Sequence, residues 1–328
     1  MADKMSAAAR KAYKAAYKKA AKKRKSHWLF IQKGDSGKEI VSKLFTQFAC
    51  LVLIACIGIL VNEARLSISA QFINSSMQDL YYKYIDNIAD NFGGSSSGGP
   101  TESAKAMLEV NPDTVGWLKI DDTHIDLPVV QRRGSGGNEY YLKIAFDGST
   151  NKAGTVFLDA RDTLTEKNRS SNLIFYGHNQ KDKTMFGDLE KYKNNVDFYK
   201  DHPYVTFSSN YRTDKYKIFA YFVTPVLPTQ TRDGIIFDYH NFIDLDRSKY
   251  NEFISNIELR NEIITPVDVQ YGDEFITLST CSNEFDPSRF VVFARKIRDG
   301  EEEFIDTAAA TLNPGALKPD FNFIYGRA

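Results

Sequence analysis

The sequence predicts a mainly β fold, a closed barrel of seven to eight strands with helices on its N-terminal side. The first observation behind this prediction is a series of short segments, rich in β-branched and aromatic residues and separated by turn residues. The predicted strands are Val115–Ile120, Ile125–Val130, Thr155–Leu158, Leu173–Tyr176, Tyr204–Ser208, Tyr216–Val223, Phe275–Cys281 and Phe290–Ala294. The second is one long helix before the strand that ends at Cys281, whose apolar residues recur at helical spacing: Tyr250, Phe253, Ile254 and Ile257.

The composition supports a folded protein, and the charge is distributed unevenly along the chain. With 328 residues, of which 42% are hydrophobic and 13% aromatic, the chain can build a core, and disorder throughout is excluded. The formal net charge is zero, but thirteen Lys and Arg against three acids give residues 1–43 a charge of +10, so residues 44–328 carry −10. An acidic body of this kind offers no general nucleic-acid surface, so we expect no nucleic-acid partner.

The basic segment is followed directly by Leu44–Val61, a run of eighteen uncharged residues. This run is just long enough to cross a bilayer, and positive charge stays on the cytoplasmic side. We therefore expect a single-pass protein of the cell membrane, with its N-terminus in the cytoplasm and everything after Val61 outside. A cleaved secretion signal is the competing interpretation, but no small-residue cleavage pattern ends the run. A buried core helix is weaker still, because it leaves the basic flank unexplained.

These patterns divide the chain into five parts. Residues 1–43 form a basic tail that we expect to be attracted to anionic membrane lipids, with an RNA-binding tail as the alternative. Residues 44–61 form the span, and residues 62–100 hold an amphipathic helix and a Gly/Ser linker. The main domain covers residues 101–299 and begins with a short helix capped at its first residue. Residues 300–328 form an extension without an assigned role.

Cys281 and Arg289 are predicted to lie at the same end of the sheet. The segments Phe275–Cys281 and Phe290–Ala294 are neighbouring strands, so an antiparallel pairing brings the end of the first beside the start of the second. A guanidinium beside a thiol favours the thiolate, which is the form that attacks carbonyl carbon. The alternative is a buried cysteine that fills space, with Arg289 as a solvated loop charge.

Two further observations favour a reactive thiol. Cys50 and Cys56 lie within the apolar span, so Cys281 is the only cysteine of the exported part and has no disulfide partner in this chain. Thiol chemistry also needs a proton donor, and His178 follows a glycine at the end of an apolar strand, where it can project into a cleft. By itself, His178 fits a structural histidine equally well. We expect no metal and no cofactor, because no cluster of metal ligands and no nucleotide-binding glycine pattern occurs.

These three residues and their surroundings resemble the sortases, the membrane-anchored cysteine transpeptidases of Gram-positive cell surfaces. Thr277-Leu-Ser-Thr-Cys281 matches the Thr-Leu-x-Thr-Cys signature of that family. The similarity extends from about Asn111 to Ile297 and its details resemble class B. The segments that carry it are Asn111–Leu118, Pro128–Gln131, Asn138–Leu142, Gly154–Asp159 and Tyr176–Leu189, together with the helix before the Cys281 strand.

The resemblance implies a sortase-like barrel with a Cys–His–Arg site at its rim. Cys281 is expected to attack the Thr carbonyl of a C-terminal sorting signal in a secreted protein, which leaves a thioacyl-enzyme. His178 is expected to protonate the departing amine and then to accept a proton from the incoming amine of a peptidoglycan precursor or a pilin. Arg289 is expected to hold the substrate and to stabilise the oxyanion.

The resemblance also implies a groove for the sorting signal, with Asn138 and Leu142 shaping it and Ser279 lying along it. Two other functions remain open from the residues themselves. A non-enzymatic surface receptor on the same barrel needs no Cys, His and Arg at one rim, so their coincidence argues against it. A cysteine endopeptidase would hydrolyse the same intermediate, and the sequence separates it poorly because the difference lies in how the acceptor is bound.

The charge asymmetry around Leu44–Val61 generates a prediction about topology. Protease added to intact protoplasts should degrade the domain that follows Gly93 and should spare an epitope at the N-terminus. Immunoblots for both ends of the full chain provide the measurement, and permeabilised protoplasts are the control in which both ends are lost. Protection of the domain in intact protoplasts would reverse the proposed orientation.

Overall fold

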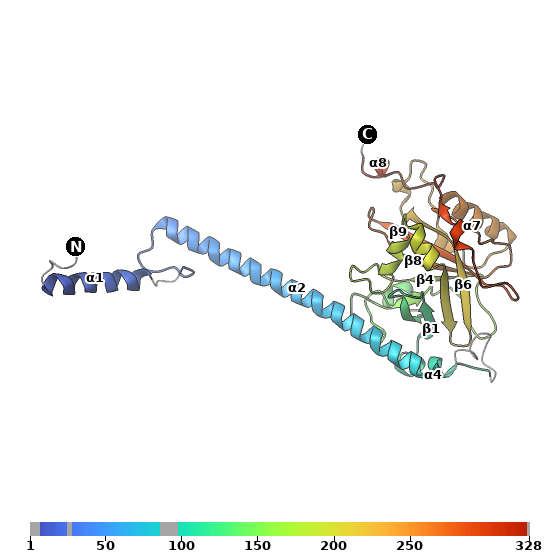
Figure 1. Ribbon diagram of the computed structural model, residues 1–328, viewed down its shortest axis with the longest axis horizontal. Coiled ribbons are helices and arrows are strands. Elements are labelled where there is room, and N and C mark those ends of the chain that lie inside the picture. The colour runs from blue at the N-terminus through green and yellow to red at the C-terminus, as the bar shows by residue number, and fades with distance from the viewer. Residues whose placement is uncertain (1–6, 25–27, 86–97, 327–328) are drawn as a thin grey trace. The chain divides into compact units, whose positions relative to one another are not determined.

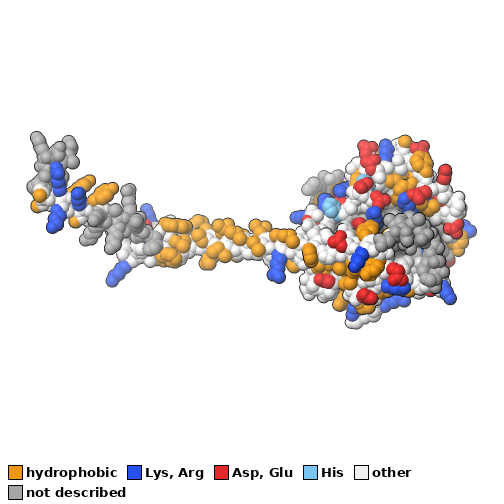
Figure 2. All heavy atoms as spheres, turned by 60° about the horizontal axis from the view of Figure 1, so that its bottom comes forward, with side chains coloured by type: hydrophobic (Ala, Val, Ile, Leu, Met, Phe, Trp, Pro, Cys, Tyr) orange, Lys and Arg blue, Asp and Glu red, His pale blue; other side chains and the backbone are white. Residues whose placement is uncertain are grey.

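The computed structural model describes residues 7–24, 28–85 and 98–326 (Figure 1). The chain divides into two compact units, Met1–Arg65 and Leu66–Ala328, which are described separately here. The first contains α1 (Ala7–Arg24) and the first part of α2 (Gly37–Lys83). Within the described ranges, α2 is the one helix long and apolar enough to cross a membrane, by length and composition alone. The side chains of its most apolar stretch are uncovered (Figure 2).

The helix α2 continues without a break where the sequence suggested a span followed by a separate helix. No Gly or Pro interrupts residues 62–83, so nothing in this stretch ends the helix. The amphipathic face is observed, because its apolar residues pack at the barrel: Ile73 is buried, and Met77 and Leu80 are partly buried. Ile88, the last apolar residue of the predicted amphipathic helix, and most of the predicted Gly/Ser linker lie outside the described residues.

Eight strands of the second unit form a closed barrel in the order β1-β2-β3-β4-β8-β9-β6-β5. The strands are β1 (Thr114–Lys119), β2 (Asp126–Val130), β3 (Val156–Leu158), β4 (Asn172–Tyr176), β5 (Tyr204–Ser209), β6 (Thr213–Pro225), β8 (Phe275–Cys281) and β9 (Ser288–Lys296). The predicted fold class is confirmed, and every predicted strand overlaps an observed one. The pairs β2/β3 and β4/β8 are parallel, and the other pairs are antiparallel.

The remaining elements surround the barrel. They are α4 (Glu102–Val110), α5 (Gly137–Tyr140), α6 (Val196–Asp201), α7 (Arg247–Arg260), α8 (Phe321–Ile324), the 3-10 helices η2 (Gly187–Tyr192), η3 (Pro228–Gln230), η4 (Tyr239–Asn241) and η5 (Thr307–Ala309), and the strand pair β7 (Ile263–Ile264) and β10 (Thr311–Leu312). The predicted cap of α4 is confirmed, because the Thr101 hydroxyl accepts a hydrogen bond from the Ala104 amide at 3.2 Å. The predicted long helix is α7.

The helix α7 covers the outer face of the barrel at β6, β8 and β9 (Figure 1). Its apolar stripe packs on aromatic side chains of these strands, including Phe222, Phe275 and Phe293, all of which are at most 1% exposed. A second cluster fills the barrel interior. Because β8 carries side chains into both clusters, it is buried along its whole length up to Cys281.

The extension after residue 300 folds onto the second unit and supplies a buried ion pair. Glu301 accepts hydrogen bonds from Arg295 at 2.5 and 2.9 Å and from Lys217 at 2.7 Å. Arg295, in β9, has a side chain only 1% exposed. The hydrogen bonds from Arg295 hold the pKa of Glu301 well below its ordinary value of 4.5, against the opposing effect of burial.

We expect Glu301→Gln to lower the free energy of unfolding by about 2–3 kcal/mol at neutral pH, because it leaves the Arg295 charge buried with fewer partners. A lowered pKa in the folded protein stabilises it above the ordinary value of 4.5, and this contribution is lost as the pH falls below that value. The difference between the variant and the wild type should therefore shrink in acid. Urea unfolding of the full chain in detergent at pH 7 and pH 3 measures it.

The matched control is Glu303→Gln, which removes an exposed carboxylate paired with Lys215. An exposed pair of this kind contributes about 0–1 kcal/mol. Equal effects of the two variants would contradict the role of the buried pair.

Candidate active site

The strand pairing places Cys281 and Arg289 side by side. Cys281 is the last residue of β8 and Arg289 is the second of β9, and the antiparallel register pairs these two residues directly. Directly opposed residues in such a pair have Cβ atoms about 5 Å apart. The predicted position of both residues at one end of the sheet is confirmed.

His178 lies on the other side of Cys281. The strand β4 runs parallel to β8 with Tyr176 level with Ser279, and two hydrogen bonds continue the pairing: Gly177 N to Ser279 O at 3.2 Å and Thr280 Oγ1 to Gly177 O at 2.7 Å. Continuing this register by two residues brings His178 level with Cys281, and the side chain of the next residue, Asn179, donates to the Cys281 carbonyl at 2.9 Å. The structure therefore brings all three predicted catalytic residues together.

Close packing explains why a glycine precedes His178. A Cβ atom at Gly177 would lie 2.7 Å from the ring of Phe186, closer than real Cβ contacts allow. The Phe186 amide in turn donates to the His178 carbonyl at 3.0 Å. The histidine backbone is thus fixed by close packing that only glycine permits.

The protonation of the His178 ring follows from its partner. Nε2 lies 2.8 Å from the carbonyl oxygen of Leu142, and because a carbonyl only accepts hydrogen bonds, Nε2 must carry the hydrogen. Within the described part of the chain, Nδ1 has no hydrogen-bond partner, so it is the nitrogen that can exchange a proton. The ring is half-buried, while Cys281 is exposed.

The Arg289 guanidinium has no carboxylate partner in the described part of the chain. Its Nη1 donates to the carbonyl of Ser288 at 3.1 Å, and none of the carboxylates in the described ranges lies within ion-pair distance of the guanidinium. A half-buried guanidinium with free donors can bind the oxygen atoms of a substrate.

The predicted groove residues lie in different environments. The Asn138 side chain accepts a hydrogen bond from the Ala160 amide at 2.7 Å, and Leu142 is partly buried and holds His178 through its carbonyl. Ser279 is only 2% exposed, and its hydroxyl is hydrogen-bonded to Tyr239 at 2.6 Å. Because Ser279 and Cys281 are two residues apart on β8, they share a face, and Tyr239 lies beneath the site on that face.

Tyr239 and His240 also belong to the site region. The sequence placed no element there, and among the histidines of the exported part it favoured His178 over His240. Burial raises the pKa of Tyr239 well above its ordinary value, so its hydroxyl stays protonated. His240 is stacked on Tyr176, with Nδ1 2.9 Å from the Tyr176 hydroxyl, and burial lowers its pKa. The only sequence signal was the aromatic composition of this segment.

A buried carboxylate anchors Tyr176. The Tyr176 hydroxyl donates to Asp159 at 2.9 Å, and Arg161 donates to both oxygens of Asp159 at 2.9 and 2.8 Å. Burial opposes ionisation of Asp159, but these hydrogen bonds outweigh it and lower its pKa. The ring of Tyr176, two residues before His178, is therefore fixed at its polar end.

Two cavities differ in their relation to these residues. One, of about 510 Å³, is lined by Pro225, Phe237, Leu259 and Leu317 among others. Pro225 pairs with Ser288, the residue before Arg289, so this cavity borders the site.

In the described residues, no group of three His, Cys, Asp or Glu side chains could hold a metal ion.

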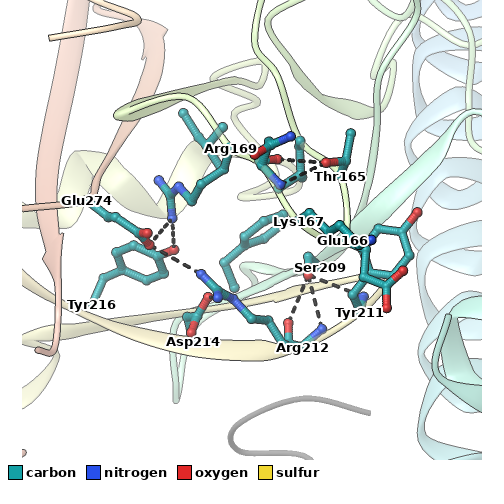
Figure 3. A pocket seen from close by; sticks show the side chains of 14 residues that line it. Thr165, Glu166, Lys167, Arg169, Ser209, Tyr211, Arg212, Asp214, Tyr216 and Glu274 are labelled. Atoms are coloured by element: carbon teal, nitrogen blue, oxygen red, sulfur yellow. Dashed lines mark hydrogen bonds and ion pairs between the residues drawn. The ribbon is translucent and has the colours of Figure 1, made fainter. Parts of the chain in front are cut away.

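The second cavity, of about 80 Å³, lies at the opposite end of β8 (Figure 3). Glu274 lines it and precedes β8, whereas Cys281 ends that strand, about 20 Å away at 3.3 Å per residue. Arg169 is paired within it, because it donates to Tyr216 at 2.6 Å and to Glu274 at 3.1 Å. This cavity is a structural feature of the barrel end.

Comparisons with known proteins point to one family. The family model described as the sortase domain matches residues 118–297. Sortase B of Staphylococcus aureus is 32% identical over 197 residues, covering 59% of this chain and 74% of that protein. Sortase B of Listeria monocytogenes is 34% identical over 185 residues, covering 56% of this chain and 69% of that protein. A solved Staphylococcus aureus sortase B–substrate complex has a TM-score of 0.57 and 26% identity, and covers 71% of this chain and 98% of that one.

Proposed function

Because this chain belongs to the sortase family, class B, and is a cysteine transpeptidase of cell-wall sorting signals, we propose that Cys281, His178 and Arg289 carry out its reaction. The observation that supports this assignment is the strand order β4-β8-β9, which sets the thiol between the imidazole and the guanidinium. Three reactive side chains on adjacent strand ends meet the geometric requirement for nucleophilic catalysis.

In the first step, the Cys281 thiolate attacks the carbonyl carbon of the Thr residue at the cleavage point. The carbonyl oxygen becomes an oxyanion, and the unpaired donors of Arg289 stabilise the charge as it develops. His178 in its protonated form gives the Nδ1 proton to the departing amine while Nε2 stays on the Leu142 carbonyl. The C–N bond breaks, and a thioester between the sorting signal and Cys281 remains.

In the second step, an amine attacks the thioester. His178 accepts the proton of the incoming amine at Nδ1, the new amide bond forms, and the Cys281 thiolate leaves. The proton given up in the first step is thus regained in the second. Water could replace the amine, which is the endopeptidase alternative.

We propose that Asn138 and Leu142 border the groove for the sorting signal. The Asn138 side chain is tied to the backbone after β3, and Leu142 contacts His178, so both belong to the β4 side of the site. Ser279 acts indirectly in this proposal, because its side chain is buried and holds Tyr239 beneath Cys281.

The proposed location is the outer face of the cell membrane. The apolar part of α2 serves as a single-pass anchor with the basic tail in the cytoplasm, where it contacts membrane lipids. The substrates are secreted proteins with a C-terminal sorting signal, and the acceptor is an amine of a peptidoglycan precursor or a pilin. Tethering raises the effective concentration of lipid-linked amines at the site.

Substitutions at the three residues test the assignment. Cys281→Ala should abolish cleavage of a fluorescence-quenched peptide library with Thr at the cleavage position. His178→Ala should lower the rate by about 10²–10⁴, and Arg289→Lys by about 10²–10³, because a point charge cannot reproduce the planar fork.

The control for these substitutions is Cys56→Ala in α2, which should keep wild-type activity. Melting temperatures of all variants must stay close to that of the wild type. Wild-type turnover by Cys281→Ala would place the site elsewhere.

The choice between amine and water generates a second prediction. With a sorting-signal peptide and a graded series of glycyl and diamino-acid acceptors, mass spectrometry of the products should show amide formation that increases with acceptor concentration. Hydrolysed peptide should form slowly when no amine acceptor is supplied. If every acceptor at saturating concentration yields only hydrolysed peptide, the endopeptidase replaces the transpeptidase.

A further inference from the structure

A buried lysine lies behind the turn that follows Cys281. Lys193, in the link between η2 and α6, has a side chain only 8% exposed. Its ammonium donates to Glu190 Oε1 at 2.8 Å, to Ser282 Oγ at 2.8 Å and to Glu284 Oε2 at 2.9 Å. An ammonium has three donors, so all of them are used. Two of the three acceptors belong to the turn between β8 and β9.

The same cluster reaches the main chain of Cys281. Glu190 Oε1 also accepts a hydrogen bond from Asn179 Nδ2 at 2.6 Å, and Asn179 Nδ2 donates to the carbonyl oxygen of Cys281 at 2.9 Å. A continuous path of hydrogen bonds thus runs from Lys193 through Glu190 and Asn179 to Cys281.

The position of this path matters because β4 ends before β8 does. The regular pairing of β4 with β8 stops at Tyr176 and Ser279, two residues short of Cys281. On that side, the Cys281 carbonyl is held by the side chain of Asn179. On the β4 side, the main chain at Cys281 is therefore held by a side chain from outside the sheet.

Lys193 also balances charge in this cluster. Glu190 and Glu284 are only 21% and 29% exposed, and both approach the same ammonium. Without that cation, two carboxylates would face each other beside the turn and repel. The ammonium also lies 5.0 Å from the ring of Phe290, the β9 residue that pairs with Thr280.

We propose that Lys193 is a positioning residue for the transpeptidase reaction. It holds the main chain at Cys281 and the start of the following turn, so that the thiol keeps its attack geometry. Displacing a reacting group by about 1 Å can cost 10²-fold in rate. This inference rests on the proposed role of Cys281 as the nucleophile.

The first test is Lys193→Met in the full chain in detergent, assayed with the fluorescence-quenched Thr peptide library. We expect kcat to fall by about tenfold or more while KM changes less than about twofold, because the groove is untouched and only the nucleophile is displaced. The matched control is Lys200→Met, which removes a lysine of α6 that is paired with the exposed Asp197. Equal kcat values for the two variants would overturn the proposal.

The second test separates positioning from a general loss of stability. Asn179→Ala buries no charge and removes only the amide that reaches Cys281, so it should also lower kcat. If Lys193 acts through Asn179, the double variant Lys193→Met/Asn179→Ala should be about as slow as the slower single variant. Multiplying effects, or a wild-type kcat for Asn179→Ala, would refute the path.

The outcome is distinguishable from a failure of the proposed function. An active Cys281→Ala variant would remove the nucleophile on which both rest. An inactive Cys281→Ala variant together with a fully active Lys193→Met variant would leave the proposed function standing and remove only the positioning role.

Discussion

The hydrogen-bond ladder that joins β8 to both of its neighbours is the constraint on which the site depends. The strand β8 pairs with β4 on one side and with β9 on the other, and these registers decide what lies beside Cys281. Side chains alternate along a strand, so a slip of one residue would turn Cys281 to the opposite face of the sheet. Burial of every β8 side chain before Cys281 makes such a slip costly.

Both ends of β8 are held by polar side chains, charged ones at its start and an amide at its other end. At its start, Arg169 donates to the Phe275 carbonyl at 2.7 Å, and Arg295 stands opposite Phe275 in β9 and binds Glu301. At its other end, Asn179 holds the Cys281 carbonyl. Because β8 is held at its start and supported at its end, the exposed thiol of Cys281 lies at a rigid position, as the proposed catalytic role requires.

The inner and outer faces of the barrel pack against different parts of the chain at this site. The interior cluster packs between the strands of the closed barrel. The outer face is covered by α7 and by the segment that contains Tyr239. Since Ser279 and Cys281 share a face, the hydrogen bond between Ser279 and Tyr239 connects the outer layer to the strand two residues before the thiol. The proposed catalytic residues therefore lie where the outer layer and the strand ends meet.

The sequence by itself determined the barrel, the long helix and the group of Cys281, His178 and Arg289. Strand residues alternate and cluster locally, and the reactive residues stand directly at strand ends, so short segments of sequence contain this information. The position of His178 at a strand end was predicted, but the tautomer of its ring depends on Leu142, 36 residues away in the chain.

Only the tertiary structure decided the partners of these residues. The contacts of Ser279 with Tyr239 and of Asn179 with Cys281 join residues 40 and 102 positions apart. The predicted groove residue Ser279 is buried for the same reason, since a strand residue has no surface once another layer covers its face. A pattern in the sequence defines which residues share a face, but which segment of the chain covers that face is fixed by packing of the whole fold.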